Sequence, residues 1–292
     1  MSEVKLRHYP EAACAALLVG LFRLLPLDWA SALGGAIAGF IGPLLPLSRK
    51  AERRAADILG IPAAEARTVI RAMWRHLGRC AGEFPHVPEM RPGGRHADRL
   101  EVTGREHGRA LFSGDKGGFL MTGHIGNWEV QPAACLHLGQ PALVVYRAAN
   151  NPLVDAMIDR FRQQTAAGTA PKGAQGAKDI VRAVRKGGFI GMLVDQKMND
   201  GLPVPFFGRP AMSPAAIAQM ALRYDVPIVP IRCERLDGAR FRVSFHPPVE
   251  IAPSGEREAD VLTLMARVND VLEGWIRERP EQWLWLHKRW PE

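Results

Sequence analysis

The stretch GFLMTGHIGNWE at residues 118–129 decides how this chain folds. Its first part, 118–122, is an apolar run that predicts a buried strand. Gly123 and Gly126 flank His124, and because glycine has no side chain, another backbone segment or a ligand can approach this turn closely. A helix is predicted to begin directly afterwards. In open α/β sheets ligands bind at the carboxyl ends of strands, so the sequence places His124 where a ligand is expected.

Short apolar runs alternate with helical patterns on both sides of this stretch. The alternation predicts an α/β fold with a mixed, largely parallel sheet flanked by helices. Strands are expected at 100–103, 118–122, 142–146, 189–194, 226–232 and 241–245, and helices at 128–138, 152–166, 177–186, 214–224 and 256–279. Upstream, 51–83 is predicted to be helical with a break at 60–62, and 85–95 to be a loop. Ser213 before Pro214 is typical of an N-cap followed by proline at the first helical position.

The first 50 residues are unusually apolar. From Trp29 to Leu47 the only polar residue is Ser31, and a basic cluster (Arg49, Lys50, Arg53 and Arg54) follows. About 20 apolar residues can cross a bilayer, but glycines and prolines interrupt this run. We interpret 1–50 as a membrane-anchoring region of two short apolar helices that lie in or dip into one leaflet, with the basic cluster on anionic headgroups. Residues 51–292 then form the catalytic domain. A buried helical hairpin and a signal peptide cleaved near Ala30-Ser31-Ala32 are the alternatives.

Composition narrows the classes of protein. Of the 292 residues 47% are hydrophobic and 23% are charged, which excludes a disordered chain and a polytopic membrane protein. The net charge of +8 favours an anionic partner without choosing among nucleic acid, acidic lipid, phosphorylated substrate and acidic carrier protein. The four cysteines are too far apart in sequence for a zinc knuckle or a redox pair, so reduced thiols are expected.

His124 and Glu129 are the first candidates for chemistry. On a continuous helix they would point about 140° apart, but a turn at His124 lets the chain fold back and pair them. The carboxylate would then hold the imidazole tautomer and stabilise the imidazolium, and such a pair activates a hydroxyl supplied by the substrate. The same spacing also fits a structural pair in which Glu129 only favours the helix N-terminus. No metal is expected, because further ligands at a suitable spacing are lacking.

The segment GHIGNWE resembles the His-x4-Asp/Glu signature of glycerolipid-type acyltransferases. It is most similar to the branch that performs the late acylations of lipid A, the lauroyl/myristoyl acyltransferases. Further segments agree in order and spacing: VYRAANNP at 145–152, Arg162, LVDQ at 193–196, VPFFG at 204–208 and PEQWLWLHKRW at 280–290. Ala148 departs from the family's usual proline after Tyr-Arg. The resemblance covers nearly the whole chain.

This resemblance implies an enzyme that moves a fatty acyl chain from acyl carrier protein to a hydroxyl of a lipid A precursor without a cofactor. His124 would be the general base and Glu129 would orient and charge it. Arg162 would stabilise the oxyanion or bind a substrate phosphate. Asp195, at the end of the strand predicted at 189–194 and on the same side of the sheet as His124, would hydrogen-bond the acceptor or fix Arg162. The full set of expected substrate contacts is Arg162, Asp195, Asn127, Gln196, Tyr146 and Arg147. The enzyme would work at the cytoplasmic face of the inner membrane.

The basic surplus then has a use, because acyl carrier proteins are acidic and lipid A precursors carry phosphates. Arg182, Arg185 and Lys186 on one predicted helix would attract the carrier. Three alternatives stay open: a phosphatidylinositol mannoside type of acceptor, a thioesterase in which the same pair activates water, and a nucleic-acid-binding protein. The last is not expected, since no recognisable binding motif occurs. The tryptophan-rich tail and the 206–208 segment fit core packing as well as membrane or acyl-chain contacts.

Overall fold

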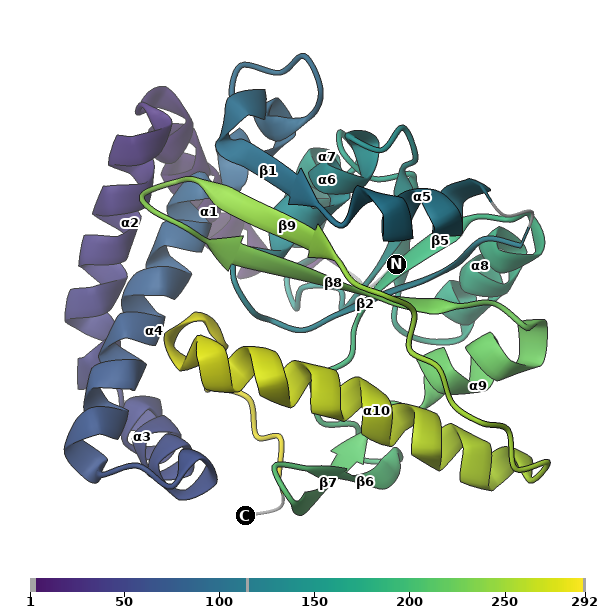
Figure 1. Cartoon of the computed structure of the whole chain (residues 1–292). Coiled ribbons are helices and arrows are strands. Elements are labelled where there is room, and N and C mark those ends of the chain that lie inside the picture. The colour runs from purple at the N-terminus through teal and green to yellow at the C-terminus, as the bar shows by residue number, and fades with distance from the viewer. Residues whose placement is uncertain (1–3, 114–115, 291–292) are drawn as a thin grey trace.

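The computed structural model describes residues 4–113 and 116–290, and a seven-stranded sheet is at its centre (Figure 1). The strands follow the order β1-β9-β8-β2-β5-β3-β4. Neighbours are parallel except β8 and β9, which pair antiparallel. The bounds are β1 Leu100–Thr103, β2 Gly118–Thr122, β3 Ala142–Tyr146, β4 Gly168–Pro171, β5 Phe189–Leu193, β8 Ile228–Arg235 and β9 Phe241–Phe245. A separate antiparallel hairpin joins β6 (Leu202–Phe206) to β7 (Arg209–Ser213). The predicted mixed, largely parallel sheet is confirmed.

Helices cover both faces of this sheet. The α-helices are α1 His8–Leu24, α2 Leu27–Ile41, α3 Pro46–Leu59, α4 Ala63–Glu83, α5 Arg105–Ser113, α6 Gln131–Leu136, α7 Pro152–Arg162, α8 Ala174–Arg185, α9 Ala216–Tyr224 and α10 Arg257–Glu278. Successive residues of a strand point to opposite faces. Phe119 and Met121 of β2 therefore join the core under α8, α9 and α10, whereas Leu120 joins the core under α5 and α6. Figure 1 shows α10 lying along one face, with the β6–β7 hairpin beyond it.

The short 3-10 helices are η1 Gly42–Leu44, η2 Phe84–Met90, η3 Ala97–Arg99, η4 Trp128–Val130 and η5 Pro280–Gln282. The residues expected as a loop at 85–95 therefore begin with 3-10 turns. The predicted break between two helices at 60–62 is confirmed, because Gly60 ends α3 with a φ of 66°. Ser213 is not the expected N-cap. It ends β7, and α9 begins only at Ala216.

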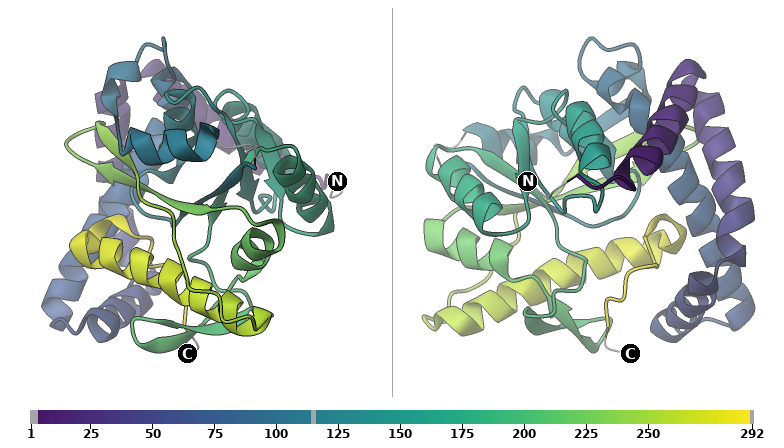
Figure 2. Two further views of the ribbon diagram at one scale, coloured as in Figure 1. Left: turned by 45° about the vertical axis from the view of Figure 1, so that its right-hand side comes forward. Right: turned by 180° about the vertical axis from the view of Figure 1, so that it is seen from behind.

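The N-terminal helices form a wall beside the sheet, and Figure 2 shows α1 and α2 from behind. α2 packs closely on α4 through glycines: a Cβ at Gly34 would lie 2.3 Å from the carbonyl oxygen of Gly78, and one at Gly42 would lie 2.1 Å from the Trp74 ring. α1 packs against α7 and η2. The segment Leu27–Leu44 is long and apolar enough to span a membrane by length and composition.

The outer face of this wall is apolar. Trp29, Phe40 and Leu44 are 72%, 76% and 75% exposed. The other large hydrophobic side chains exposed in this region are Val4, Leu6, Tyr9, Leu17, Leu18, Leu21, Leu24, Leu33, Ile37, Ile41 and Leu47. Among the described residues beyond it, only Leu236 and Leu262 are comparably exposed. Large apolar patches of this kind are typical of surfaces that contact a membrane or another protein.

Candidate active site

The turn after β2 has a shape that only glycine permits. Gly126 has a φ of 59°, and a Cβ there would lie 1.9 Å from the carbonyl oxygen of Cys233. The C-terminal segment holds the turn from the other side: the Leu284 amide donates to the His124 carbonyl at 3.0 Å, and the Gly126 amide donates to the Gln282 carbonyl at 3.0 Å. Two distant parts of the chain thus fix the backbone of His124.

His124 is paired with Asp195. Strands β2 and β5 are parallel neighbours, and Thr122 lies opposite Leu193, so the residues that follow each strand meet at the same edge. The imidazole Nδ1 lies 2.7 Å from Asp195 Oδ1, and the His124 backbone amide donates to Oδ2 at 2.7 Å. Trp283 Nε1 also donates to Oδ2, at 2.9 Å. A Cβ at Gly123 would lie 3.2 Å from the carboxylate carbon, so glycine lets the two strands' ends approach.

The charge of Asp195 is stabilised in place. Its side chain is fully buried. Burial alone would raise the pKa of this carboxyl, but the charge attraction and hydrogen bond of His124, followed by the attraction of His287, hold the pKa well below its ordinary value. Asp195 is therefore ionised and can only accept hydrogen bonds. His124 Nδ1 is therefore the nitrogen that donates to Asp195, and in the neutral form of the imidazole the lone pair is on Nε2.

The lone pair on His124 Nε2 faces polar and aromatic groups. Gln196 Nε2 lies 3.2 Å from it and 3.4 Å from Nε2 of His287. The His287 ring is 4.7 Å from the His124 ring, and the Trp128 ring is 5.0 Å from it, both centre to centre. The pKa of His287 is lowered to about 4, first by burial and then by repulsion from His124, so His287 is neutral near pH 7. His287 therefore adds no positive charge beside His124 Nε2 near pH 7.

His287 is a residue of the site that was not predicted from the sequence. It lies in the tail segment WLWLH at 283–287, where every second side chain is large. Trp283 and Trp285 are fully buried and Trp290 is nearly so, which supports core packing for this tail. The alternation of aromatic residues, which ends on His287, was the sequence feature that could have marked this residue. It does not show that the tail packs at the strand end that carries His124.

Glu129 is not the hydrogen-bond partner of His124 in this structure, contrary to the expected pairing. Its carboxylate is held by Arg162, whose Nε donates to Oε2 at 2.9 Å and whose Nη2 donates to Oε1 at 2.5 Å. Trp128 Nε1 adds a contact of 3.2 Å. The bidentate pair with Arg162 satisfies the Glu129 carboxylate. Asp195, which follows the neighbouring strand β5, is the hydrogen-bond partner of His124 instead.

Arg162 also lies over the ring of Tyr146, with 5.5 Å from the guanidinium carbon to the ring centre. Burial lowers the pKa of Arg162, but its hydrogen bond and charge attraction to Glu129 outweigh this and raise it above the ordinary value. Tyr146, Arg162 and Glu129 thus form one group close to the histidine turn. The exposed Arg147 contacts Asn150 at 3.4 Å instead.

Asn127 differs from its expected role as a substrate contact, because its side chain is fully buried. Its amide donates to Glu83 Oε2 at 2.8 Å. The same carboxylate is paired with both Nη atoms of Arg235 and accepts a hydrogen bond from Ser31 of α2 at 2.6 Å. We call these four residues the Glu83 cluster. It connects the apolar helix α2, through α4, to the turn that carries His124.

The site as a whole is a histidine with a buried carboxylate at Nδ1 and the Gln196 amide at Nε2, at the carboxyl end of a central strand. A histidine placed in this way is of the kind that general acid-base catalysis uses. Within residues 4–113 and 116–290, no group of three His, Cys, Asp or Glu side chains is placed to hold a metal ion.

Comparison with known proteins agrees with this class. The chain matches the family described as "Bacterial lipid A biosynthesis acyltransferase" over residues 3–292 and belongs to that family. It is 29% identical to the lipid A biosynthesis lauroyltransferase of Escherichia coli (strain K12) over 207 residues, which are 68% of this chain and 64% of the relative. It is 24% identical to the lipid A biosynthesis palmitoleoyltransferase of the same strain over 231 residues, 78% of this chain and 72% of that protein.

A relative with another kind of acceptor in its name is also similar. The phosphatidylinositol mannoside acyltransferase of Mycobacterium tuberculosis (strain CDC 1551 / Oshkosh) is 23% identical over 243 residues, covering 80% of this chain and 74% of the relative. The chain is therefore similar to proteins named for different glycolipids.

Proposed function

We propose that this protein transfers a fatty acyl chain from the thioester of acyl carrier protein to a hydroxyl group of a lipid A precursor. The observation that carries the proposal is the His124–Asp195 pair, which engages Nδ1 and leaves Nε2, beside the Gln196 amide, as the nitrogen that can accept a proton. Family membership supports an acyl-transfer reaction, and the names of the two Escherichia coli relatives support a lipid A acceptor.

The chemistry follows from the geometry. The acceptor hydroxyl displaces the Gln196 amide from His124 Nε2. His124 Nε2 then takes the hydroxyl proton as the hydroxyl oxygen attacks the thioester carbonyl carbon. Asp195 stabilises the imidazolium that forms. The tetrahedral intermediate collapses, the carbon–sulfur bond breaks, and the imidazolium returns its proton to the leaving thiolate, so that an ester and a free thiol result. General base catalysis of this kind contributes roughly 10²- to 10⁴-fold, and the displaced Gln196 amide can donate a hydrogen bond to the developing oxyanion.

The apolar outer face supports a position on the cytoplasmic face of the inner membrane. One face of α2 is packed on α4, so only the opposite face, with Trp29 and Phe40, is available to lipid. A helix of this kind lies in the interface with its apolar side in the acyl region. The full chain should sediment with membranes and be released by detergent. A chain that stays in the high-speed supernatant without detergent would contradict this position.

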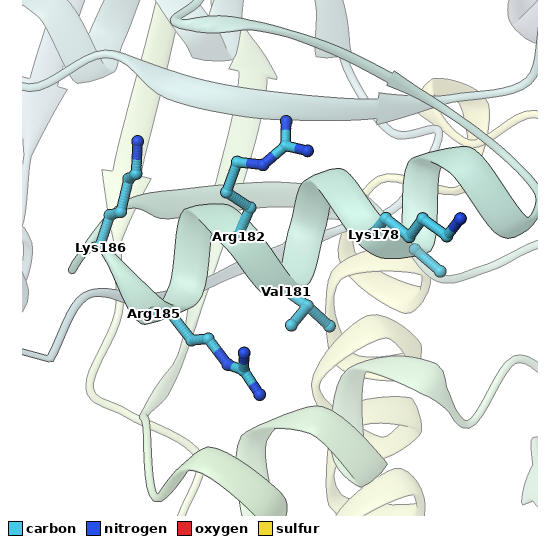
Figure 3. A pocket seen from close by; sticks show the side chains of 6 residues that line it. Lys178, Val181, Arg182, Arg185 and Lys186 are labelled. Atoms are coloured by element: carbon cyan, nitrogen blue, oxygen red, sulfur yellow. The ribbon is translucent and has the colours of Figure 1, made fainter.

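The donor proposal rests on a cationic surface along α8. Figure 3 shows Lys178, Arg182 and Arg185 projecting from this helix and Lys186 at its C-terminal end. These residues line a shallow surface pocket of about 500 Å³. Arg182 shares its charge with Asp179 at 3.3 Å. Lys186 precedes β5 and Asp195 follows it, so Lys186 and the site lie at opposite ends of this strand, roughly 16 Å apart. The carrier's flexible prosthetic arm is suited to bridge such a span.

One transfer assay tests the reaction. Purified protein in detergent receives an acyl chain on acyl carrier protein or on coenzyme A, together with a lipid A precursor, and the products are identified by mass. We expect an acylated precursor from the carrier donor and none with His124→Ala. Release of free fatty acid without acylated lipid would instead indicate a thioesterase.

A phosphatidylinositol mannoside acceptor is the second candidate, favoured by the Mycobacterium tuberculosis relative. The same assay includes it as a parallel acceptor. A higher kcat/KM for this glycolipid than for the lipid A precursor would replace the first candidate with the second.

A further inference from the structure

A cationic groove lies between α3 and the C-terminal segment, outside the catalytic site. Its volume is about 580 Å³, and the described residues that line it are Lys50, Arg53, Arg54, Asp57, Ile58, Arg209 and Trp290. Four of these are cations and one is a carboxylate. Asp57 is already engaged by Arg209, with Nη2 donating to Oδ1 at 2.8 Å. The groove therefore presents an excess of positive charge in a concave surface.

The groove lies next to the apolar outer face. Leu44 and Leu47, both exposed, stand at the junction of η1 and α3, and Lys50 and Arg53 follow one and two helical turns later. If the apolar face contacts acyl chains, these cations reach the level of the headgroups. Lysine and arginine side chains near such a boundary extend toward the polar layer.

The groove also shares a wall with the catalytic site. Arg54 Nη1 donates to the carbonyl of Trp285 at 2.7 Å, and Trp290 Nε1 donates to the carbonyl of Phe206 at 3.0 Å. The same C-terminal segment contributes Trp283 to Asp195 and His287 to the vicinity of His124. The groove and the catalytic site thus border the same stretch of chain, residues 283–290.

We propose that this groove binds a phosphate group on the headgroup of the acceptor glycolipid. The inference rests on the proposed function, because it assigns the groove to the acceptor rather than to the donor. Both acceptor types carry phosphate: lipid A precursors are phosphorylated, and a phosphatidylinositol mannoside contains a phosphodiester. Guanidinium groups bind phosphate oxygens through two parallel hydrogen bonds, and a lysine adds a point charge. Anchoring the phosphate orients the sugar so that one hydroxyl reaches His124 Nε2.

The test compares two forms of one acceptor. Wild-type protein, the double variant Lys50→Gln/Arg53→Gln and the control Arg109→Gln, which removes an exposed cation from α5, are assayed with the phosphorylated lipid A precursor and with the same lipid after phosphatase treatment. The double variant should raise KM for the phosphorylated acceptor at least about 10-fold, since charge-assisted hydrogen bonds are lost. KM for the dephosphorylated acceptor and for the donor should match wild type. The control should match wild type throughout.

Further arms separate the sources of phosphate. Inorganic phosphate at millimolar concentration should compete with the acceptor if the groove recognises a phosphate group alone. Sedimentation with vesicles of phosphatidylglycerol and of phosphatidylcholine tests a general anionic surface: a double variant that loses binding to the first and shows an equal rise in KM for both acceptors would overturn the proposal.

Calorimetric titration of both acceptor forms into the detergent-dispersed protein gives a readout that does not depend on turnover. Tighter binding of the phosphorylated form by wild type, but not by the double variant, would support the groove even if no acyl transfer occurred, and in that case the proposed function alone would fail. Equal binding of the two forms by wild type would overturn the groove assignment.

Discussion

Asp195→Asn removes the charge beside His124 and keeps the shape of the side chain. The wild-type carboxylate accepts three hydrogen bonds, from His124 Nδ1, from the His124 amide and from Trp283 Nε1. An asparagine has one acceptor oxygen and one NH2 group, which is a donor. If the NH2 group replaces Oδ1, it faces His124 Nδ1–H; if it replaces Oδ2, it faces the His124 amide and Trp283 Nε1–H. Turning the imidazole to avoid this conflict would present the wrong nitrogen to the substrate.

The size of the effect can be worked out from the geometry. Two unit charges about 4 Å apart attract by about 4 kcal/mol at an effective dielectric constant of 20. If that attraction is lost when the imidazolium forms, kcat falls about 10³-fold. The buried donor left unpaired costs about 1–3 kcal/mol of folding stability. The variant should therefore fold, with a lowered melting temperature and a much larger fall in rate than in substrate binding.

The assay is kcat at saturating donor and acceptor, measured with the melting temperature of each variant. Asp270→Asn, which changes an exposed aspartate on α10, is the matched control and should behave as wild type. If Asp195→Asn keeps more than about a tenth of the wild-type kcat, the reasoning from the His124–Asp195 pair is wrong. A greater loss of kcat with Glu129→Gln than with Asp195→Asn would show that Glu129 becomes the partner of His124 during turnover.

Three further outcomes are expected. Glu129→Gln should act through Arg162, raising the acceptor KM about 10-fold while the pH profile of kcat keeps its wild-type shape; a shifted profile would contradict this. Reversing the charges of Arg182, Arg185 and Lys186 should raise KM for the carrier-bound donor and weaken its salt dependence, and unchanged kinetics would place docking elsewhere. Folding stability should fall by about 3 kcal/mol as the pH drops from about 6.5 to about 4, because the pKa of His287 is lower in the folded protein and the unfolded chain binds the proton first. Denaturant unfolding across this pH range should show a shallower decline for His287→Gln than for wild type.

The strand, turn and helix around His124 could be predicted from the sequence, because each of these elements is specified by nearby residues. The apolar run, the two glycines and the following helix signal lie within 12 residues, and strands at 100–103, 118–122, 142–146 and 241–245 match the structure residue for residue. The hairpin β6–β7 was missed because Pro203 and Pro205 in β6 argue against a strand. β4 was missed for a similar reason, since it is a short edge strand that begins with Gly168 and ends with Pro171.

The partner of His124 was beyond local reasoning. Asp195 was expected at a strand end on the same side of the sheet, but its contact with the imidazole depends on the parallel register of β2 and β5. Nearness in sequence favoured Glu129, and only the fold shows that Arg162 from α7 engages it. The catalytic role of Glu129, the membrane position and the division of the chain at residue 50 stay predictions.

The Glu83 cluster has a practical consequence for removing the apolar outer face of this protein. Cutting away the first 45 residues would remove the Ser31 hydroxyl from a buried carboxylate and bare the glycine strip of α4, which Gly34 now covers. Such a shortened chain should aggregate and lose the support beneath the histidine turn. Changing the exposed residues Phe40 and Leu44 to charged residues keeps the Ser31–Glu83 hydrogen bond and the packing of Gly34 on α4. It is therefore the better way to make the outer face polar.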